Sequence, residues 1–262
     1  MSEPTHDPAR RGPKPRVAVV FGGMSSEHAI SCVTAGSVLA AIDREAYDVV
    51  PIGIATDGRW VLESGDPDRL RIESPERLPR VDGGRATITL APEAASTGLV
   101  VTEPSQPPRT LGDVDVVFPL LHGPWGEDGT IQGMLEMAGV RYVGAGVLAS
   151  AVSMDKAYMK VVLAAAGLPV MPSTTVTARQ WAADPTACRE RVGALGYPLF
   201  AKPARGGSSI GISKVHDATE LDGALEEALR YDPKVLLEGY AAGAREVECG
   251  VVQALDGTPE DS

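Results

Sequence analysis

The chain has 262 residues, of which 44% are hydrophobic and only 5% aromatic, and its formal net charge is −11. This length is typical of two domains, whose cores must be built from Val, Leu, Ile, Ala and Met. The negative charge disfavours nonspecific binding to nucleic acid or to an anionic membrane, although a few lysines can still hold a small anion. No apolar run approaches the length that crosses a membrane. We therefore expect neither nucleic acid nor membrane as a partner.

The N-terminus and the cysteines indicate a cytoplasmic protein. Residues 1–15 have no apolar core, so we expect a disordered tail rather than a signal peptide. The cysteines are Cys32, Cys188 and Cys249, an odd number without metal-type spacing. Their apolar or helical contexts predict buried free thiols, which suit the reducing cytoplasm.

Residues 16–146 show the pattern of an α/β domain with a parallel sheet. The apolar run 17–21 ends at two glycines and predicts a buried strand. A helix follows, with Ser25 or Ser26 as its cap. Its expected apolar face includes Ile30, Val33, Val38 and Leu39. A second strand over 47–54 completes a right-handed parallel unit, the opening of a doubly wound sheet.

The remaining elements follow in chain order. The first domain continues with strands expected over 59–62, 86–90, 114–121 and 140–143 and a helix over 130–138. A boundary near 144–151 separates it from an α+β segment over 147–262. That segment is expected to contain helices over 155–166, 180–195 and 219–230 and strands over 174–176, 199–203, 212–215, 235–238 and 246–252.

The most informative segment is 200–212. An apolar strand delivers Lys202, and a loop follows that contains Gly206, Gly207, Ser208, Ser209 and Gly211. Glycines let backbone N–H groups approach an anion, serine hydroxyls add donors, and the lysine adds a positive charge. These are the parts of a phosphate-binding loop. The lysine precedes the glycines, so this is not a Walker A motif, and taken alone it could equally be a surface hairpin.

Four other parts of the sequence extend this pattern. Segments 21–28 and 121–133 each follow a predicted buried strand, at the sheet edge where α/β proteins bind ligands. Segment 153–156 opens a helix, and 236–240 together with 245–249 lies near the end of the chain. In their order and spacing, the five parts closely resemble the D-alanine–D-alanine ligases of the ATP-grasp superfamily, over about residues 16–252.

The resemblance implies a fold and an activity. The fold would be a Rossmann-like pre-ATP-grasp domain over 16–146, on the side of the first D-alanine, followed by the first, α+β part of an ATP-grasp domain over 147–262. The activity would be ATP-dependent joining of two D-alanines for peptidoglycan synthesis. The carboxylate of the first D-alanine attacks the γ-phosphate to form an acyl phosphate, and the amine of the second displaces phosphate. The resemblance also implies a homodimer through the first domain.

Several residues match family positions that bind ATP. Lys156 and Lys202 would lie beside the phosphates, and backbone amides of the glycine loop would cover them. Glu238 would accept from the adenine amino group, and Glu246, or Glu248 as the alternative, would bind the ribose. The ATP-binding residues implied are Lys156, Lys202, Gly207, Ser208, Ser209, Ile210, Glu238, Tyr240, Ala241 and Glu246. Alone, such residues are more often solvated lysines and exposed carboxylates.

Three residues match positions around the first D-alanine. Glu27 would orient its ammonium group, and Ser208 would hydrogen-bond toward the same subsite; these two are the expected catalytic residues. His122 would lie near the substrate carboxylate. A glutamate at a helix N-terminus is also an ordinary cap, and a lone histidine is often structural. Glu127 and Asp128 are expected to fix their loop and cap the helix behind it.

The resemblance also implies what this chain lacks. Family members continue beyond residue 262 with the carboxylate and amide ligands of two Mg²⁺ ions, for which Mn²⁺ can substitute. We therefore expect no metal ligands in residues 1–262 and no turnover by these residues alone. A D-alanine–D-lactate ligase shares all these motifs and stays an alternative. A non-catalytic nucleotide-binding module and a purely structural α/β domain are the others.

Overall fold

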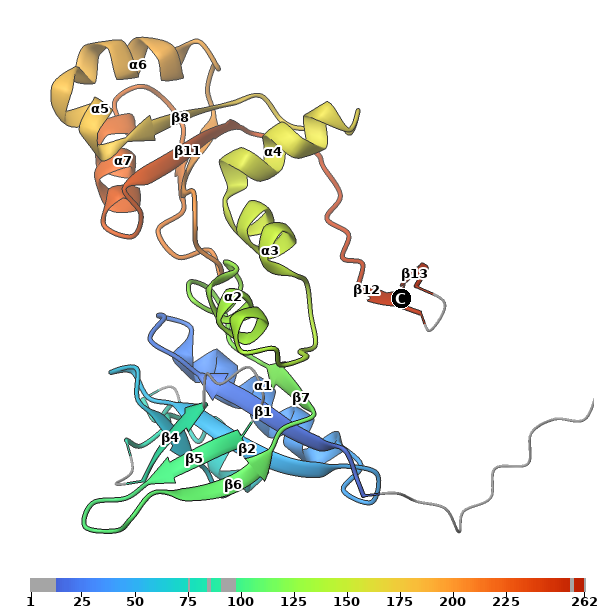
Figure 1. Cartoon of the computed structure of the whole chain (residues 1–262). Helices are drawn as coiled ribbons and strands as arrows, with labels where there is room; N and C mark the ends of the chain where they lie inside the picture. The colour runs from blue at the N-terminus through green and yellow to red at the C-terminus, as the bar shows by residue number, and fades with distance from the viewer. Residues whose placement is uncertain (1–12, 75, 84–85, 91–97, 255–256, 262) are drawn as a thin grey trace, which may run out of the picture.

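The computed structural model describes residues 13–74, 76–83, 86–90, 98–254 and 257–261. Residues 1–12 of the expected tail lie outside the described residues. Two bodies follow one another along the chain, each built on its own sheet. Three helices run from the first body toward the second, namely α2 (Thr130–Met137), α3 (Val147–Met154) and α4 (Lys156–Ala165) (Figure 1).

The first sheet is mixed rather than parallel. Among the described residues it contains seven strands in the order β6-β5-β4-β3-β2-β1-β7. Their bounds are β1 Arg16–Gly22, β2 Asp48–Ile54, β3 Trp60–Leu62, β4 Thr87–Leu90, β5 Gly98–Thr102, β6 Arg109–Asp113 and β7 Val116–Pro119. β1 pairs in parallel with β2 and β7, whereas β3 to β6 pair antiparallel. The expected parallel sheet is wrong for these outer strands, because connections such as 55–59 and 103–108 are too short for a parallel crossover.

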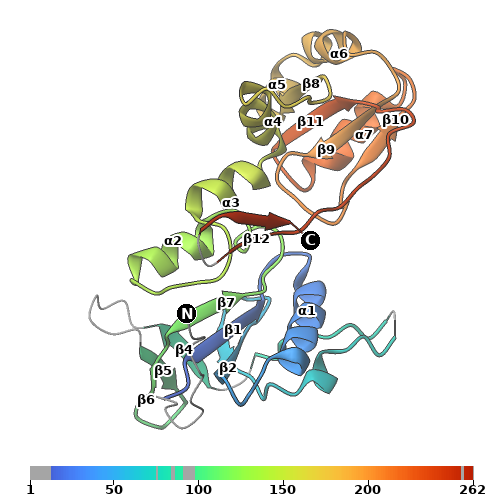
Figure 2. The same ribbon diagram turned by 90° about the vertical axis from the view of Figure 1, so that its right-hand side faces the viewer.

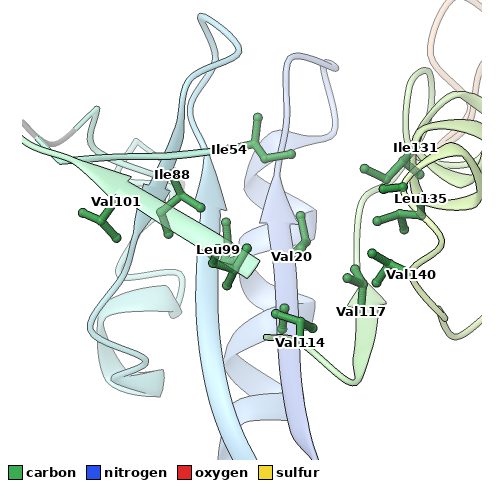
Figure 3. Close-up of a cluster of buried hydrophobic side chains, with 13 residues drawn as sticks. Val20, Ile54, Ile88, Leu99, Val101, Val114, Val117, Ile131, Leu135 and Val140 are labelled. Carbon is green, nitrogen blue, oxygen red and sulfur yellow. The ribbon is translucent and has the colours of Figure 1, made fainter. Parts of the chain in front are cut away.

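Strand β1 is buried on both faces, which explains its unbroken apolar sequence. Its odd-numbered residues face α1 (His28–Ala41), where Val19 and Phe21 share a cluster with Cys32 and other small side chains. Its even-numbered residues face α2 (Thr130–Met137), and Val20 shares a cluster with Leu135 (Figure 3). The strand thus holds a helix on each side of the sheet.

Helix α1 differs from its prediction at its start and on its buried face. It begins at His28 with Glu27 as the N-cap residue, and neither expected serine caps it. Ile30, expected on the apolar face, is 47% exposed. The buried positions are mostly small residues, namely His28, Ser31, Cys32, Ala35, Gly36 and Leu39. Close approach of the helix to β1 selects small side chains there, and hydrophobicity alone therefore misplaced the face.

The second body contains an antiparallel sheet with the described order β10-β9-β11-β8. The strands are β8 Ser173–Thr177, β9 Leu199–Pro203, β10 Ser213–Val215 and β11 Lys234–Gly239, and the helices are α5 Ala178–Ala183, α6 Pro185–Gly193 and α7 Leu221–Leu229. Its core joins Leu199, Leu225 and Leu237. The helix expected over 180–195 is split at Asp184, whose side chain caps α6 ahead of Pro185.

The segment between the bodies holds α3 (Val147–Met154) and α4 (Lys156–Ala165). The sequence predicted α4 but took the region of α3 as a boundary. The strand expected over 140–143 is reduced to one bridge between Val117 and Tyr142. The strand expected over 246–252 is mostly irregular, and β12 (Val251–Gln253) pairs with β13 (Pro259–Asp261) in a hairpin near residues 142–146 (Figure 2).

The three cysteines differ in exposure. Cys32 and Cys188 are buried free thiols as expected, but Cys249 is exposed because its segment is irregular rather than a core strand.

The short 3-10 helix η1 (Pro67–Leu70) packs against α1. Within the described ranges, no helix has both the length and the apolarity needed to span a membrane.

Candidate functional site

The glycine loop between β9 and β10 contacts the first domain. Ser208 and Ser209 adopt left-handed backbone angles, with φ of 48° and 58°. The Ser208 hydroxyl donates a short hydrogen bond to Oε1 of Glu27, 181 residues away in sequence. A Cβ on Gly207 would lie 2.9 Å from Oε2 of the same carboxylate, so glycine is needed for this approach. The two expected catalytic residues therefore meet at the junction of the domains.

Glu27 is buried at the N-cap position of α1, after the loop that follows β1, with 5% of its surface exposed. The Ser25 hydroxyl accepts from the Glu27 N–H at 3.2 Å and donates to the His122 carbonyl at 2.7 Å. A Cβ on Gly123 would lie 2.5 Å from Oε2 of Glu27. The carboxylate is thus enclosed by glycines from two loops, and a buried carboxylate calls for a charged or hydrogen-bonding partner.

The loop after β7 positions His122. Nε2 of His122 lies 3.1 Å from the Thr34 hydroxyl, which donates to the Ile30 carbonyl, so the ring nitrogen donates to Thr34. Glu127 accepts from the Gly123 N–H at 2.7 Å, and Asp128 accepts from the N–H groups of Trp125 and Thr130. Glu127 and Asp128 fix the loop as expected, but the N-cap residue of α2 is Gly129, and only Asp128 holds the helix, through the Thr130 N–H.

Lys156 begins α4, and its ammonium group faces the glycine loop. It donates to the Gly206 carbonyl at 2.6 Å and to the Pro203 carbonyl at 3.3 Å. Burial, and next the positive charge of Lys202, lower the pKa of Lys156. The neighbouring Asp155 caps the helix and forms a short ion pair with Lys234. Lys156 is therefore held at the loop, and it senses the charge of Lys202.

Glu238 on β11 receives one lysine on each oxygen. Lys202 Nζ lies 2.6 Å from Oε2, and Lys160 Nζ lies 2.5 Å from Oε1. Burial raises the pKa of Glu238, but the hydrogen bonds from Lys160 and Lys202 outweigh it and hold that pKa below its usual value. The lysine cluster is hereafter Glu238 with its two lysines, Lys160 and Lys202, together with Lys156, whose ammonium group lies near Lys202.

The remaining predicted ATP residues lie in two places. Gly207, Ser209 and Ile210 belong to the glycine loop, where the Ile210 N–H bonds back to the Gly207 carbonyl. Tyr240 and Ala241 follow β11, and the Tyr240 ring lies 5.9 Å from the Phe200 ring and 4.0 Å from Lys214 Nζ. Tyr240 and Ala241 therefore lie at the C-terminal end of β11, as Glu238 does.

Glu246 is not brought into the lysine cluster. It and Glu248 are exposed in the irregular segment that leaves the second body after β11 (Figure 1). The strand that would have directed these carboxylates is not formed, so the choice between them stays open.

Sequence reasoning missed three charged residues of the site. Lys160 is 9% exposed and lies in the helix expected over 155–166, but the sequence analysis gave it no role. Its signal was present, because Lys156 and Lys160 are four residues apart and so lie on one helix face. Asp232 accepts from the backbone and side chain of Arg205 and so anchors the start of the glycine loop. Asp232 and Arg205 have no local signal, because 27 residues separate them.

Comparison with known proteins identifies the family. Residues 16–145 match the family model described as D-ala D-ala ligase N-terminus, and residues 162–260 match the one described as D-ala D-ala ligase C-terminus. The chain belongs to the D-alanine–D-alanine ligase family. A D-alanine–D-alanine ligase of Streptomyces griseus is 57% identical over 252 residues, and one of Paenarthrobacter aurescens is 58% identical over 240 residues.

Solved structures of family members share the fold. The D-alanine–D-alanine ligase of Coxiella burnetii matches with a TM-score of 0.75 and 33% identity over 95% of this chain and 69% of that one. The VanG D-Ala:D-Ser ligase of Enterococcus faecalis matches with a TM-score of 0.73 and 35% identity over 88% of this chain and 64% of that one. The α/β fold is therefore that of the ATP-grasp ligases, as the sequence predicted.

The alignments cover nearly all of this chain but a smaller share of each relative. The alignment takes in 93% of this chain but 64% of the Streptomyces relative, and 92% of this chain but 63% of the Paenarthrobacter relative. The chain thus spans somewhat less than two thirds of the length of these family members.

Proposed function

We propose that this chain supplies the ATP-binding part and the first D-alanine subsite of a ligase that joins two D-alanines for peptidoglycan synthesis in the cytoplasm. The observation that carries the proposal is the lysine cluster beside the glycine loop. Lys160 and Lys202 face the Glu238 carboxylate, and the ammonium group of Lys156 lies near enough to Lys202 for the two charges to repel. Nearby carboxylates partly balance Lys156, namely Asp232, Asp155 and Glu27. In a chain of net charge −11, three lysines gathered beside a loop of backbone amides favour a polyanion such as a triphosphate.

The proposed first step is transfer of the γ-phosphoryl group of ATP to the carboxylate of D-alanine. The bond between the γ-phosphorus and its bridging oxygen breaks, ADP leaves, and a carboxylate oxygen forms the new bond. The amine of the second D-alanine then attacks the acyl carbon, and phosphate leaves. Lys156 and Lys202 would neutralise charge on the transferring group, and the amides of 207–210 would donate to it.

The proposed D-alanine subsite lies at Glu27. Its carboxylate would bind the substrate ammonium group, and His122 would lie near the substrate carboxylate. The Ser208 hydroxyl, which donates to Glu27, ties this subsite to the glycine loop. Closure of the loop over ATP and orientation of D-alanine would therefore be coupled through one hydrogen bond.

The nucleoside and the metal complete the proposal. Glu238, Tyr240 and Ala241 would hold the adenine, and Glu246 or Glu248 the ribose. Two Mg²⁺ ions, or Mn²⁺ in their place, belong to the proposal for the complete ligase. Among the described residues no three His, Cys, Asp or Glu side chains gather into a possible metal site, so the metal ligands are not assigned to them and no step is derived through the metal.

The partners of the proposed ligase are D-alanine, ATP and a second copy of the chain bound through the first domain. The likeness to a D-Ala:D-Ser ligase makes D-serine a second candidate for the second substrate. D-Lactate stays an alternative on the sequence motifs.

The experiment is a chimera that joins this chain to the remaining C-terminal third of the Streptomyces griseus relative. We expect phosphate release from ATP that depends on D-alanine. Glu27→Gln should reduce it at least tenfold, because a charge-assisted hydrogen bond to the substrate ammonium group is lost. Asp57→Asn removes an exposed carboxylate of the same domain and is the matched control. Equal activity of the two variants, or an inactive chimera beside an active relative, would contradict the proposal.

A further inference from the structure

Lys160 is the buried residue of α4, while Tyr158 and the two valines of that helix are exposed. Among the described positions of the helix, Lys160 alone is classed as buried, whereas Tyr158 is 62% and Val161 65% exposed. Its ammonium group donates to the Met171 carbonyl at 2.9 Å and to Glu238 at 2.5 Å. Burial of a lysine is unfavourable unless it is paired, so this position has a specific task.

The two lysines on Glu238 are held differently. The Lys160 side chain is 11% exposed and has Met171 as a second partner. The Lys202 side chain is 24% exposed, adjoins the glycine loop, and has the face of Phe200 at 5.4 Å beside its ion pair with Glu238. A triphosphate that competes for an ammonium group would therefore draw Lys202 away more easily than Lys160.

Departure of Lys202 would change what Glu238 can bind. Oε2 would lose its donor, whereas Oε1 would keep Lys160. A free carboxylate oxygen fixed at the end of β11 is a suitable acceptor for an exocyclic amine. The same carboxylate without Lys160 would be free to rotate.

We propose that Lys160 is a positioning residue that anchors Glu238, so that Lys202 and the amino group of adenine can exchange at Oε2. The inference rests on the proposed function, because it takes ATP as the ligand. It adds to that function a source of base specificity: Lys202 is released to the phosphates only as the base amine replaces it. A nucleotide with an oxygen in place of this amine, such as ITP, would place an acceptor against the carboxylate and bind less well.

The test compares ATP with ITP in calorimetric titrations of the 262-residue chain. We expect the wild type to prefer ATP by about tenfold or more, the effect of one charge-assisted hydrogen bond. Lys160→Met should bring the ratio of the two dissociation constants close to one, and Lys160→Arg should restore part of it. Lys14→Met removes an equal charge at a distant site and should leave the ratio unchanged.

A double-mutant cycle separates positioning from a structural role. In the Glu238→Gln background, Lys160→Met should leave the ATP-to-ITP ratio unchanged, because the acceptor is already altered. A purely structural lysine would weaken both nucleotides alike and leave the wild-type ratio in place, which would overturn the inference. If Lys160→Met does not fold, the same decision rests on Lys160→Arg, whose ratio must fall below that of the wild type. A wild-type chain that binds neither nucleotide would instead overturn the proposed function.

Discussion

Gly207 is the position where one methyl group tests contact between the glycine loop and Glu27. Its φ lies outside the left-handed region, so alanine suits its backbone. The added Cβ would lie 2.9 Å from Oε2 and 3.0 Å from Oε1 of Glu27, whereas the same methyl group on Gly206 would meet Pro203 at an ordinary 3.8 Å. Overpacking of this kind costs about 1–3 kcal/mol. Gly207→Ala should therefore raise the equilibrium constant between the loop away from Glu27 and the loop in contact with it by about 5- to 150-fold.

Hydrogen exchange of a peptide covering 204–212, measured by mass spectrometry, reports this equilibrium. We expect faster exchange in Gly207→Ala and wild-type exchange in Gly206→Ala. In a Glu27→Ala background the methyl group has space, so Gly207→Ala should add little. Equal exchange in the two glycine variants, or a Gly207→Ala effect that persists without the Glu27 carboxylate, would refute the steric reasoning.

Two other predictions concern thiols and acid stability. Burial raises the pKa of Cys32 to about 12, and Cys188 is also buried, so iodoacetamide at pH 8 should modify Cys249 first. After unfolding, all three thiols should react, and intact-protein mass spectrometry counts the modified thiols. Rapid modification of Cys32 in the native protein would contradict the prediction. The pKa of Glu238 in the folded protein lies below its usual value of 4.5. The ionised carboxylate therefore stabilises the fold fully above pH 4.5, and this stabilisation is lost as the pH falls through the pKa of the folded state. The difference in unfolding free energy between wild type and Glu238→Gln, from urea titrations, should therefore shrink between pH 6 and pH 3, and a widening difference would be inconsistent with the ion pairs.

Local patterns predicted the parts of the fold that depend on continuous burial or on breaking residues. β1 was predicted because a strand covered on both faces needs an apolar run, and α4 because Asp155 caps it and Gly167 follows it. The strands β5 and β6 were missed although they pair locally, with Val101 opposite Arg109. Each has only five residues, and β6 carries a glycine and two charged residues. Short strands of such composition leave little local signal.

The candidate site was predicted in its loops and less well in its charges. The resemblance pointed to Glu27 and Ser208, and the structure brings them together across 181 residues. Asp232 could not be assigned, because it has a role only through Arg205, which folding brings near. Lys160 had only the indirect signal of its spacing from Lys156, and its partner Glu238 is revealed by the fold. Glu246 was assigned from the family resemblance, within an expected strand over 246–252, and that strand does not form around it.

Titration of the 262-residue chain with ATP tests most directly whether the lysine cluster and the glycine loop hold a triphosphate. We expect saturable binding, weakened at least tenfold by Lys202→Met and by Lys156→Met but not by Lys14→Met, because each of the first two removes a charge beside the phosphates. Wild-type affinity in the Lys202 and Lys156 variants, or no binding of ATP by the unaltered chain, would contradict the account.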